Sequence, residues 1–175
     1  HYNGTGILTG AFEKCTIENI KTLANCSVEG TYNTGGIAGT GTGNISNCEN
    51  RAMVNGTNNV GGIVGNSSDN TISSCANYGA VTGTKSNVGG MVGFFISGTI
   101  QNCANYGDIS GADYVGNQIG YASICNLNNV LGIGNVTATT SQSGLLAGVI
   151  LDSSSTAAGI LAYNSSAKLT INGIE

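Results

Sequence analysis

The sequence predicts an all-β fold, a parallel β-helix (β-solenoid) of about six coils with about three short strands per coil. Two observations lead to this prediction. A glycine-rich motif recurs every 26–29 residues, and aliphatic residues recur at fixed distances after each copy. Copies of the motif start at Thr5, Thr34, Val60, Val88, Val115 and Ser143, and the last two are weaker than the others. A period of this length is typical of stacked repeats.

Three columns of apolar residues support the stacking, because each column keeps one residue type or a near match in volume. The first column holds Ile17, Ile45, Ile72, Ile100 and Leu127. The second holds Ile20, Cys48, Cys75, Cys103 and Val130, and the third holds Val28, Val54, Val81, Ile109 and Val136. Stacked repeats bury equivalent positions in one continuous core, so we expect these side chains to point inward.

Each repeat unit is expected to contain three short strands. In the third unit they lie near the glycine motif, near Thr71-Ile72-Ser73 and near Ala80-Val81-Thr82. These runs are rich in β-branched residues and are separated by Gly, Asn and Ser clusters, as strands and turns are. No run has the spacing of apolar residues that an amphipathic helix requires.

The corners of each coil are expected where glycine and asparagine cluster. Asn77-Tyr78-Gly79 and Asn105-Tyr106-Gly107 have this composition, and both residue types tolerate a left-handed backbone. The adjacent pairs Ile63-Val64 and Met91-Val92 leave two alternatives open. One residue of each pair faces solvent in a regular strand, whereas a bulge or corner turns both inward.

Composition and charge limit the classes of partner. Charged residues make up 8% of the 175 residues, and the formal net charge is −4. The basic residues are scattered, so we do not expect nucleic-acid binding, which requires a basic patch. No apolar run approaches the length of a membrane span, so we do not expect membrane insertion. Residues 1–175 are expected to form a single solenoid domain, a fragment or module of a larger protein.

The sequence offers little catalytic or metal-binding chemistry. The three cysteines of the second column are expected to be reduced, because free cysteine behaves as a small apolar residue in cores. Cys15 and Cys26 are the one pair for which a disulfide stays open. We expect no metal or other cofactor, since no Cys-x-x-Cys spacing occurs. The carboxylates are scattered and His1 is the only histidine, so we expect no catalytic site and no enzyme activity.

Tyr78 and Tyr106 form the candidate ligand face. They hold equivalent positions in adjacent units, and Arg51 and Ile133 take the same place on either side. Two interpretations stay open, namely that the rings bind a sugar or that they cover a corner of the core. Two partial threonine columns raise ice binding as a further alternative: Thr16, Thr71 and Thr99, and Thr82, Ser110 and Thr137.

The two clearest repeats resemble a known family. Val60-Gly61-Gly62-Ile63-Val64-Gly65 is followed by Thr71-Ile72-Ser73-Ser74-Cys75-Ala76-Asn77-Tyr78-Gly79, and Val88-Gly89-Gly90-Met91-Val92-Gly93 by Thr99-Ile100-Gln101-Asn102-Cys103-Ala104-Asn105-Tyr106-Gly107. This pattern resembles the GLUG repeat family of large bacterial surface and secreted proteins, most closely over residues 34–117. Similar proteins include adhesin-like proteins and accessory regions of secreted immunoglobulin A peptidases. The resemblance implies a cell-surface or extracellular module beside other domains, and it supplies no catalytic or ligand-binding residues.

The expected function is that of a non-catalytic structural or adhesive module. It would project or position neighbouring domains of a larger polypeptide, or bind a host protein or glycan. One alternative is a carbohydrate-binding or carbohydrate-active β-helix that uses Tyr78 and Tyr106. Further alternatives are an ice-binding solenoid and a filament subunit that associates end to end, because open sheet edges template strand addition.

Overall fold

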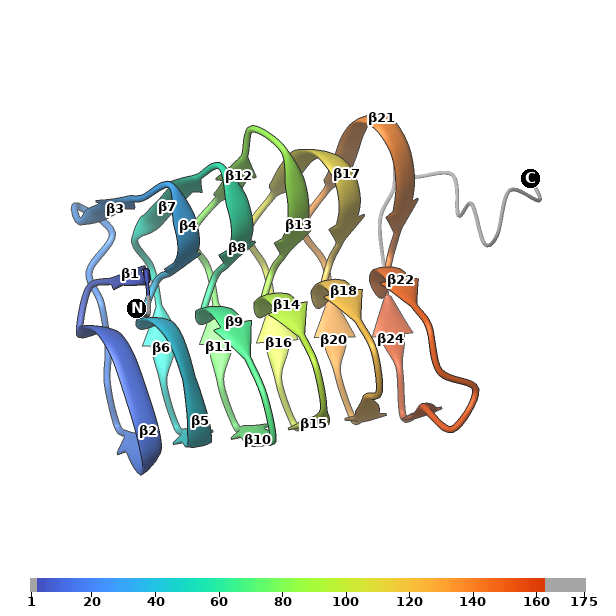
Figure 1. The fold of residues 1–175 in the computed structure, drawn as a ribbon, viewed down its shortest axis with the longest axis horizontal. Coiled ribbons are helices and arrows are strands. Elements are labelled where there is room, and N and C mark those ends of the chain that lie inside the picture. The colour runs from blue at the N-terminus through green and yellow to red at the C-terminus, as the bar shows by residue number, and fades with distance from the viewer. Residues whose placement is uncertain (1–2, 163–175) are drawn as a thin grey trace.

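The computed structural model describes residues 3–162, which form a parallel β-solenoid of about 6 turns (Figure 1). Strands of neighbouring coils pair in parallel, and the pairs join into three sheets that run along the solenoid. The all-β fold class predicted from the repeats is therefore confirmed. Within the described residues, no helix is long and apolar enough to cross a membrane.

Each regular coil passes through five strand positions, which we number in chain order. Position one holds β1 (Thr5–Gly6), β4 (Tyr32–Gly35), β8 (Asn58–Gly61) and β13 (Ser86–Gly89). Position two holds β9 (Val64–Ser67), β14 (Val92–Phe95), β18 (Ile119–Ala122) and β22 (Ala147–Ile150). Position three holds β10 (Asn70–Ser73), β15 (Gly98–Gln101), β19 (Asn126–Asn128) and β23 (Thr156–Ala158).

The remaining strands complete the coil. Position four holds β6 (Glu49–Asn50), β11 (Ala76–Asn77), β16 (Ala104–Asn105), β20 (Leu131–Gly132) and β24 (Leu161–Ala162). Position five holds β3 (Ser27–Glu29), β7 (Met53–Gly56) and β12 (Val81–Gly83). Four longer strands cover two positions each: β2 (Thr9–Glu18) and β5 (Ala38–Ser46) span two and three, and β17 (Ile109–Gly116) and β21 (Val136–Gly144) span five and one. The three strand regions expected from the sequence are present, and the coil has further short strands between them.

The glycine motif forms a corner between positions one and two. In the third coil β8 ends at Gly61 and β9 begins at Val64, so the motif is divided between two strands. Ile63 and Val64 are both fully buried, and so are Met91 and Val92 in the next coil. The structure therefore selects the alternative in which a corner turns both aliphatic residues inward.

The predicted core columns are in register. Ile72 pairs with Ile45 and Ile100, and Val81 pairs with Val54 and Ile109. The isoleucine and cysteine columns belong to one large hydrophobic cluster, and the valine column forms a second, smaller cluster. The stacking inferred from equal residue volumes is thus confirmed.

The left-handed backbone expected at Asn77-Tyr78-Gly79 and Asn105-Tyr106-Gly107 is not found, so that prediction is wrong. Most of the left-handed residues form two other columns: Asn33, Asn59, Asn87, Tyr114 and Gln142, and Asn19, Asn47, Ser74, Asn102 and Asn129. Gly79 is needed for close approach, because a Cβ atom there would collide with the carbonyl oxygen of Ala52 in the preceding coil. Gly107 meets the carbonyl oxygen of Gly79 in the same way.

Asn77 and Asn105 are fully buried members of an asparagine ladder inside the solenoid. The Asn50 Nδ2 atom donates to Asn77 Oδ1 over 2.8 Å, and Asn77 Nδ2 donates to Asn105 Oδ1 over 2.7 Å. Each amide also donates to the carbonyl oxygen two residues later, for example Asn77 to Gly79 over 2.8 Å. A buried amide is costly unless its hydrogen bonds are made, so the ladder ties successive coils together.

Both ends of the asparagine ladder are closed by other side chains. At the N-terminal end the Thr22 hydroxyl donates to Asn50 Oδ1 over 2.6 Å. At the other end Asn105 donates to Asn117 Oδ1 over 3.2 Å, and Asn117 donates to the carbonyl oxygen of Gly134 over 2.8 Å. The ladder therefore runs continuously from the first coil to the fifth.

Candidate functional site

Tyr78 and Tyr106 lie next to each other on adjacent coils, directly after β11 and β16. Their ring centroids are 4.7 Å apart and the ring planes differ by 4°. The Arg51 guanidinium lies over the Tyr78 ring at 4.9 Å from its centroid. The two tyrosines are 44% and 40% exposed, so the column predicted from the sequence forms a continuous stack on the surface.

The stacking determines which parts of the rings a ligand can reach. One face of Tyr78 is covered by Tyr106, and Arg51 lies over the same ring. Ile133 follows Tyr106 in the column, because its backbone nitrogen bonds to the carbonyl of Asn105. A sugar that stacked on the Tyr78 ring would therefore have to separate it from Tyr106 or from Arg51. The proposal of a glycan site at Tyr78 and Tyr106 stays a prediction.

A small charged cluster lies beside the tyrosine stack. The Glu49 carboxylate accepts a short hydrogen bond from Arg51 and forms an ion pair with Lys21 at 3.2 Å. The hydrogen bond from Arg51 is the main cause that lowers the pKa of Glu49. Because the side chains are partly exposed, these pairs fix the position of Arg51 over Tyr78 more than they stabilise the fold.

The cysteine column is buried and reduced. Cys48, Cys75 and Cys103 are each 2% exposed, and all six cysteines of the chain are free. Each of the three sulfurs donates to the carbonyl oxygen two residues earlier at 3.2 Å. A hydrogen bond with Cys103, together with burial, raises the pKa of Cys75 to about 12. The same hydrogen bond lowers the pKa of Cys103. A thiol reacts as its thiolate, so Cys75 stays protonated near neutral pH, and burial shields the whole column from reagents.

Several carboxylates join neighbouring coils. Asp69 accepts a short hydrogen bond from the Ser97 hydroxyl, one coil further on. Asp108 accepts bonds from the backbone and side-chain nitrogens of Asn135 at 2.8 and 3.0 Å. Among the described residues, no group of three or more His, Cys, Asp or Glu side chains is placed to hold a metal ion. The structure therefore gives these carboxylates a role in coil-to-coil contacts.

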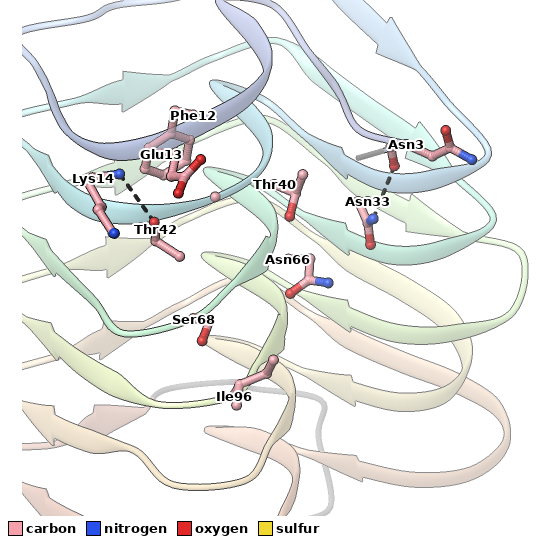
Figure 2. Close-up of a pocket in the computed structure, with 11 residues that line it drawn as sticks. Asn3, Phe12, Glu13, Lys14, Asn33, Thr40, Thr42, Asn66, Ser68 and Ile96 are labelled. Atoms are coloured by element: carbon pink, nitrogen blue, oxygen red, sulfur yellow. Dashed lines mark hydrogen bonds between the residues drawn. The ribbon is translucent and has the colours of Figure 1, made fainter. Parts of the chain in front are cut away.

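A groove of about 330 Å³ crosses the first coils at strand position two (Figure 2). Phe12, Glu13 and Lys14 of β2 form one wall, and Asn3 and Asn33 lie on the opposite side. Between the walls lie Thr40 of β5 and Asn66 of β9, which are paired in register. Ile96 closes the groove toward the fourth coil. The sequence did not predict this groove, because its residues come from four different coils and do not repeat.

A second aromatic cluster continues the column of Thr40 and Asn66. Phe94 pairs with Asn66 in register, and its ring stacks on Tyr121 at 5.0 Å with an interplanar angle of 11°. Tyr114 meets Tyr121 edge-on at 5.7 Å. The signal for this cluster was present in the sequence, since Phe94 and Tyr121 both stand two residues after the last aliphatic residue of the glycine motif.

The threonine column named for ice binding is completed by asparagines. At strand position three the aligned residues are Thr16, Asn44, Thr71, Thr99, Asn126 and Thr156. The second partial column, Thr82, Ser110 and Thr137, is also in register. Ice binding at either column stays a prediction.

Comparison of the chain with protein-family models, with curated proteins and with solved structures finds no match.

Proposed function

We propose that this chain is a non-catalytic structural module of a bacterial cell-surface or secreted protein, in which it projects or positions neighbouring domains of a longer polypeptide. The observation that carries the proposal is the unbroken stacking of its coils. Parallel backbone ladders run along every strand position, and the interior asparagine ladder follows them from Thr22 to Asn117. The resemblance to GLUG repeats supports the extracellular setting.

The stacking makes the module a rigid spacer. Six coils at the spacing of paired strands give a length of roughly 30 Å. Successive coils are joined by hydrogen bonds at all strand positions and by two apolar clusters that run along the solenoid, so bending between coils would break several contacts at once. A spacer of this kind holds the domains at its two ends at a fixed distance, which suits display or adhesion at a cell surface.

The mass and location of the native polypeptide test this proposal. An antibody raised against the chain would be used on fractionated cells and medium of the source organism. We expect a band much larger than 175 residues in the surface or secreted fraction. A free band of 175 residues in the interior of the cell would contradict the module and its location together.

A carbohydrate-binding function at Tyr78 and Tyr106 is the second candidate, because their rings form an exposed stack. The double variant Tyr78→Ala, Tyr106→Ala removes both rings at surface positions and is expected to keep the fold. If these residues bind glycan, the variant loses glycan binding while its circular dichroism spectrum is unchanged. Equal glycan binding by the variant and the original chain would end this candidate.

A further inference from the structure

The groove of Figure 2 contains polar side chains that have no partner within the described chain. The Thr40 hydroxyl and the Asn66 carboxamide make no side-chain hydrogen bond to any described residue, although Thr40 is only 8% exposed. Glu13 and Lys14, on the wall above them, form no ion pair with described residues. Four groups that could donate or accept hydrogen bonds therefore face the same space.

Several asparagines elsewhere in the solenoid pair with an asparagine of the neighbouring coil. Asn59 donates to Asn33 over 2.8 Å and Asn87 donates to Asn59 over 2.7 Å along one column. In the interior, Asn50 and Asn77 are paired in the same way. Asn66 is not paired in this way, because its register neighbours are Thr40 on one side and Phe94 on the other. Its amide is available to a ligand.

The chemistry of the groove narrows the class of ligand. The β2 wall carries one carboxylate and one ammonium group, Glu13 and Lys14, so the groove has no net charge that would favour an anion or a cation. The backbone groups of β5 and β9, which form the floor of the groove, are already paired with strands on both sides, so a peptide cannot extend the sheet there. Amide, hydroxyl and carboxylate groups beside the apolar surfaces of Phe12 and Ile96 match a molecule with many hydroxyls and an apolar ring face. The volume of about 330 Å³ lies at the lower end of the range of small-ligand sites, roughly 300–1,000 Å³.

We propose that this groove is a binding site for a neutral saccharide, with Thr40 and Asn66 as its central hydrogen-bonding residues. Asn66 donates through Nδ2 and accepts through Oδ1, and the Thr40 hydroxyl supplies a second contact one strand spacing away. Phe12 and Ile96 contact the apolar parts of the sugar ring. The site is separate from Tyr78 and Tyr106, and it is independent of the spacer function.

Nuclear magnetic resonance of the ¹⁵N-labelled chain tests the proposal with defined sugars. Glucose, galactose, mannose and N-acetylglucosamine would each be titrated, with sodium glucuronate as a charged comparison. We expect at least one neutral sugar to shift the Asn66 carboxamide and the Thr40 amide resonances saturably, with a Kd in the millimolar range. Asn66→Ala should raise that Kd roughly three- to tenfold, as expected for one lost hydrogen bond, and Thr40→Val should act in the same direction.

Asn44→Ala is the matched control, because Asn44 is an exposed asparagine on β5 outside the groove. It should leave the Kd unchanged. The proposal is overturned if none of the four neutral sugars shifts Asn66 saturably, or if only glucuronate does so. It is also overturned if Asn66→Ala and Asn44→Ala weaken binding equally, or if the shifts centre on Tyr78 and Tyr106. Because Asn66 and Thr40 make no side-chain bonds within the described fold, both variants should retain the native spectrum.

Discussion

In the fifth coil Asn117 stands where the preceding coils have glycine, and Gly132 stands where they have asparagine. In the earlier coils the second glycine of the motif lies against a buried asparagine, as Gly90 does against the side chain of Asn105. In the fifth coil the motif position holds Asn117, and the position paired with Asn105 holds Gly132. The carboxamide of Asn117 occupies the space next to Gly132, where an added Cβ would lie 2.5 Å from its Oδ1 atom. The fifth coil therefore still contributes one buried amide, although the amide comes from the glycine motif and not from strand position four.

This exchange predicts that the two positions compensate each other. Gly132→Asn alone places two side chains in one space and should lower the free energy of unfolding by about 1–3 kcal/mol. Adding Asn117→Gly restores the arrangement of the preceding coils and should recover most of the loss. Urea unfolding of the two single variants and the double variant measures this coupling. Losses that simply add in the double variant would show that the two residues do not share one space.

The interior ladder predicts a large cost for removing one amide. Asn77→Ala takes the acceptor from Asn50 and the donor from Asn105, and both of these amides are fully buried. Each buried group left without its partner costs roughly 1–3 kcal/mol. Asn44→Ala, at an exposed asparagine, should change the free energy of unfolding by less than about 0.5 kcal/mol. Similar urea midpoints for the two variants would contradict a structural role for the ladder.

Buried and exposed residues alternate along β12, so substitutions at neighbouring residues should have opposite effects on folding. Val81 is fully buried, whereas Thr82 faces solvent. Val81→Asp buries a carboxylate in the valine cluster, a cost comparable with the whole stability of a domain, and should leave the chain unfolded. Thr82→Asp should fold normally. Circular dichroism and thermal unfolding distinguish them, and equal loss of structure in both variants would refute the register.

Burial predicts two reactive and four protected thiols. Cys15 is exposed and Cys26 is half-buried, whereas the other four cysteines are buried. Desolvation raises the pKa of Cys125, and the pKa of Cys75 is raised to about 12, so neither forms thiolate near neutral pH. A colorimetric thiol reagent should find two fast thiols in the native protein and six after unfolding in guanidinium chloride. Fast reaction of all six would contradict the buried column, and protection of Cys15 and Cys26 would indicate that they are joined.

The core was predictable because it repeats. Ile72, Val81 and Cys75 each stand in a column of similar residues, and a column of equal volumes has one simple physical cause, which is stacking. The corner at Ile63 and Val64 could only be stated as one of two alternatives, because two adjacent aliphatic residues fit either a corner or a half-exposed strand.

The asparagine ladder and the groove could not be predicted from the sequence. Asn77 stands beside glycine and tyrosine, a composition typical of turns, and its burial depends on partners about one coil away. Strands such as β11 have only two residues, too few to show alternation. Thr40 and Asn66 differ from each other and from Phe94 in the same column, so no repeated pattern marks the groove.

Amide hydrogen exchange along the solenoid would show whether the stacked coils behave as one rigid body. Mass spectrometry of peptic fragments would compare β7 to β9, β12 to β14 and β17 to β18. We expect the strands of these coils to exchange together, with the free energy of global unfolding, and Asn77→Ala to lower protection in all of them. Independent exchange of each coil, with the effect of Asn77→Ala confined to its own coil, would contradict a rigid spacer.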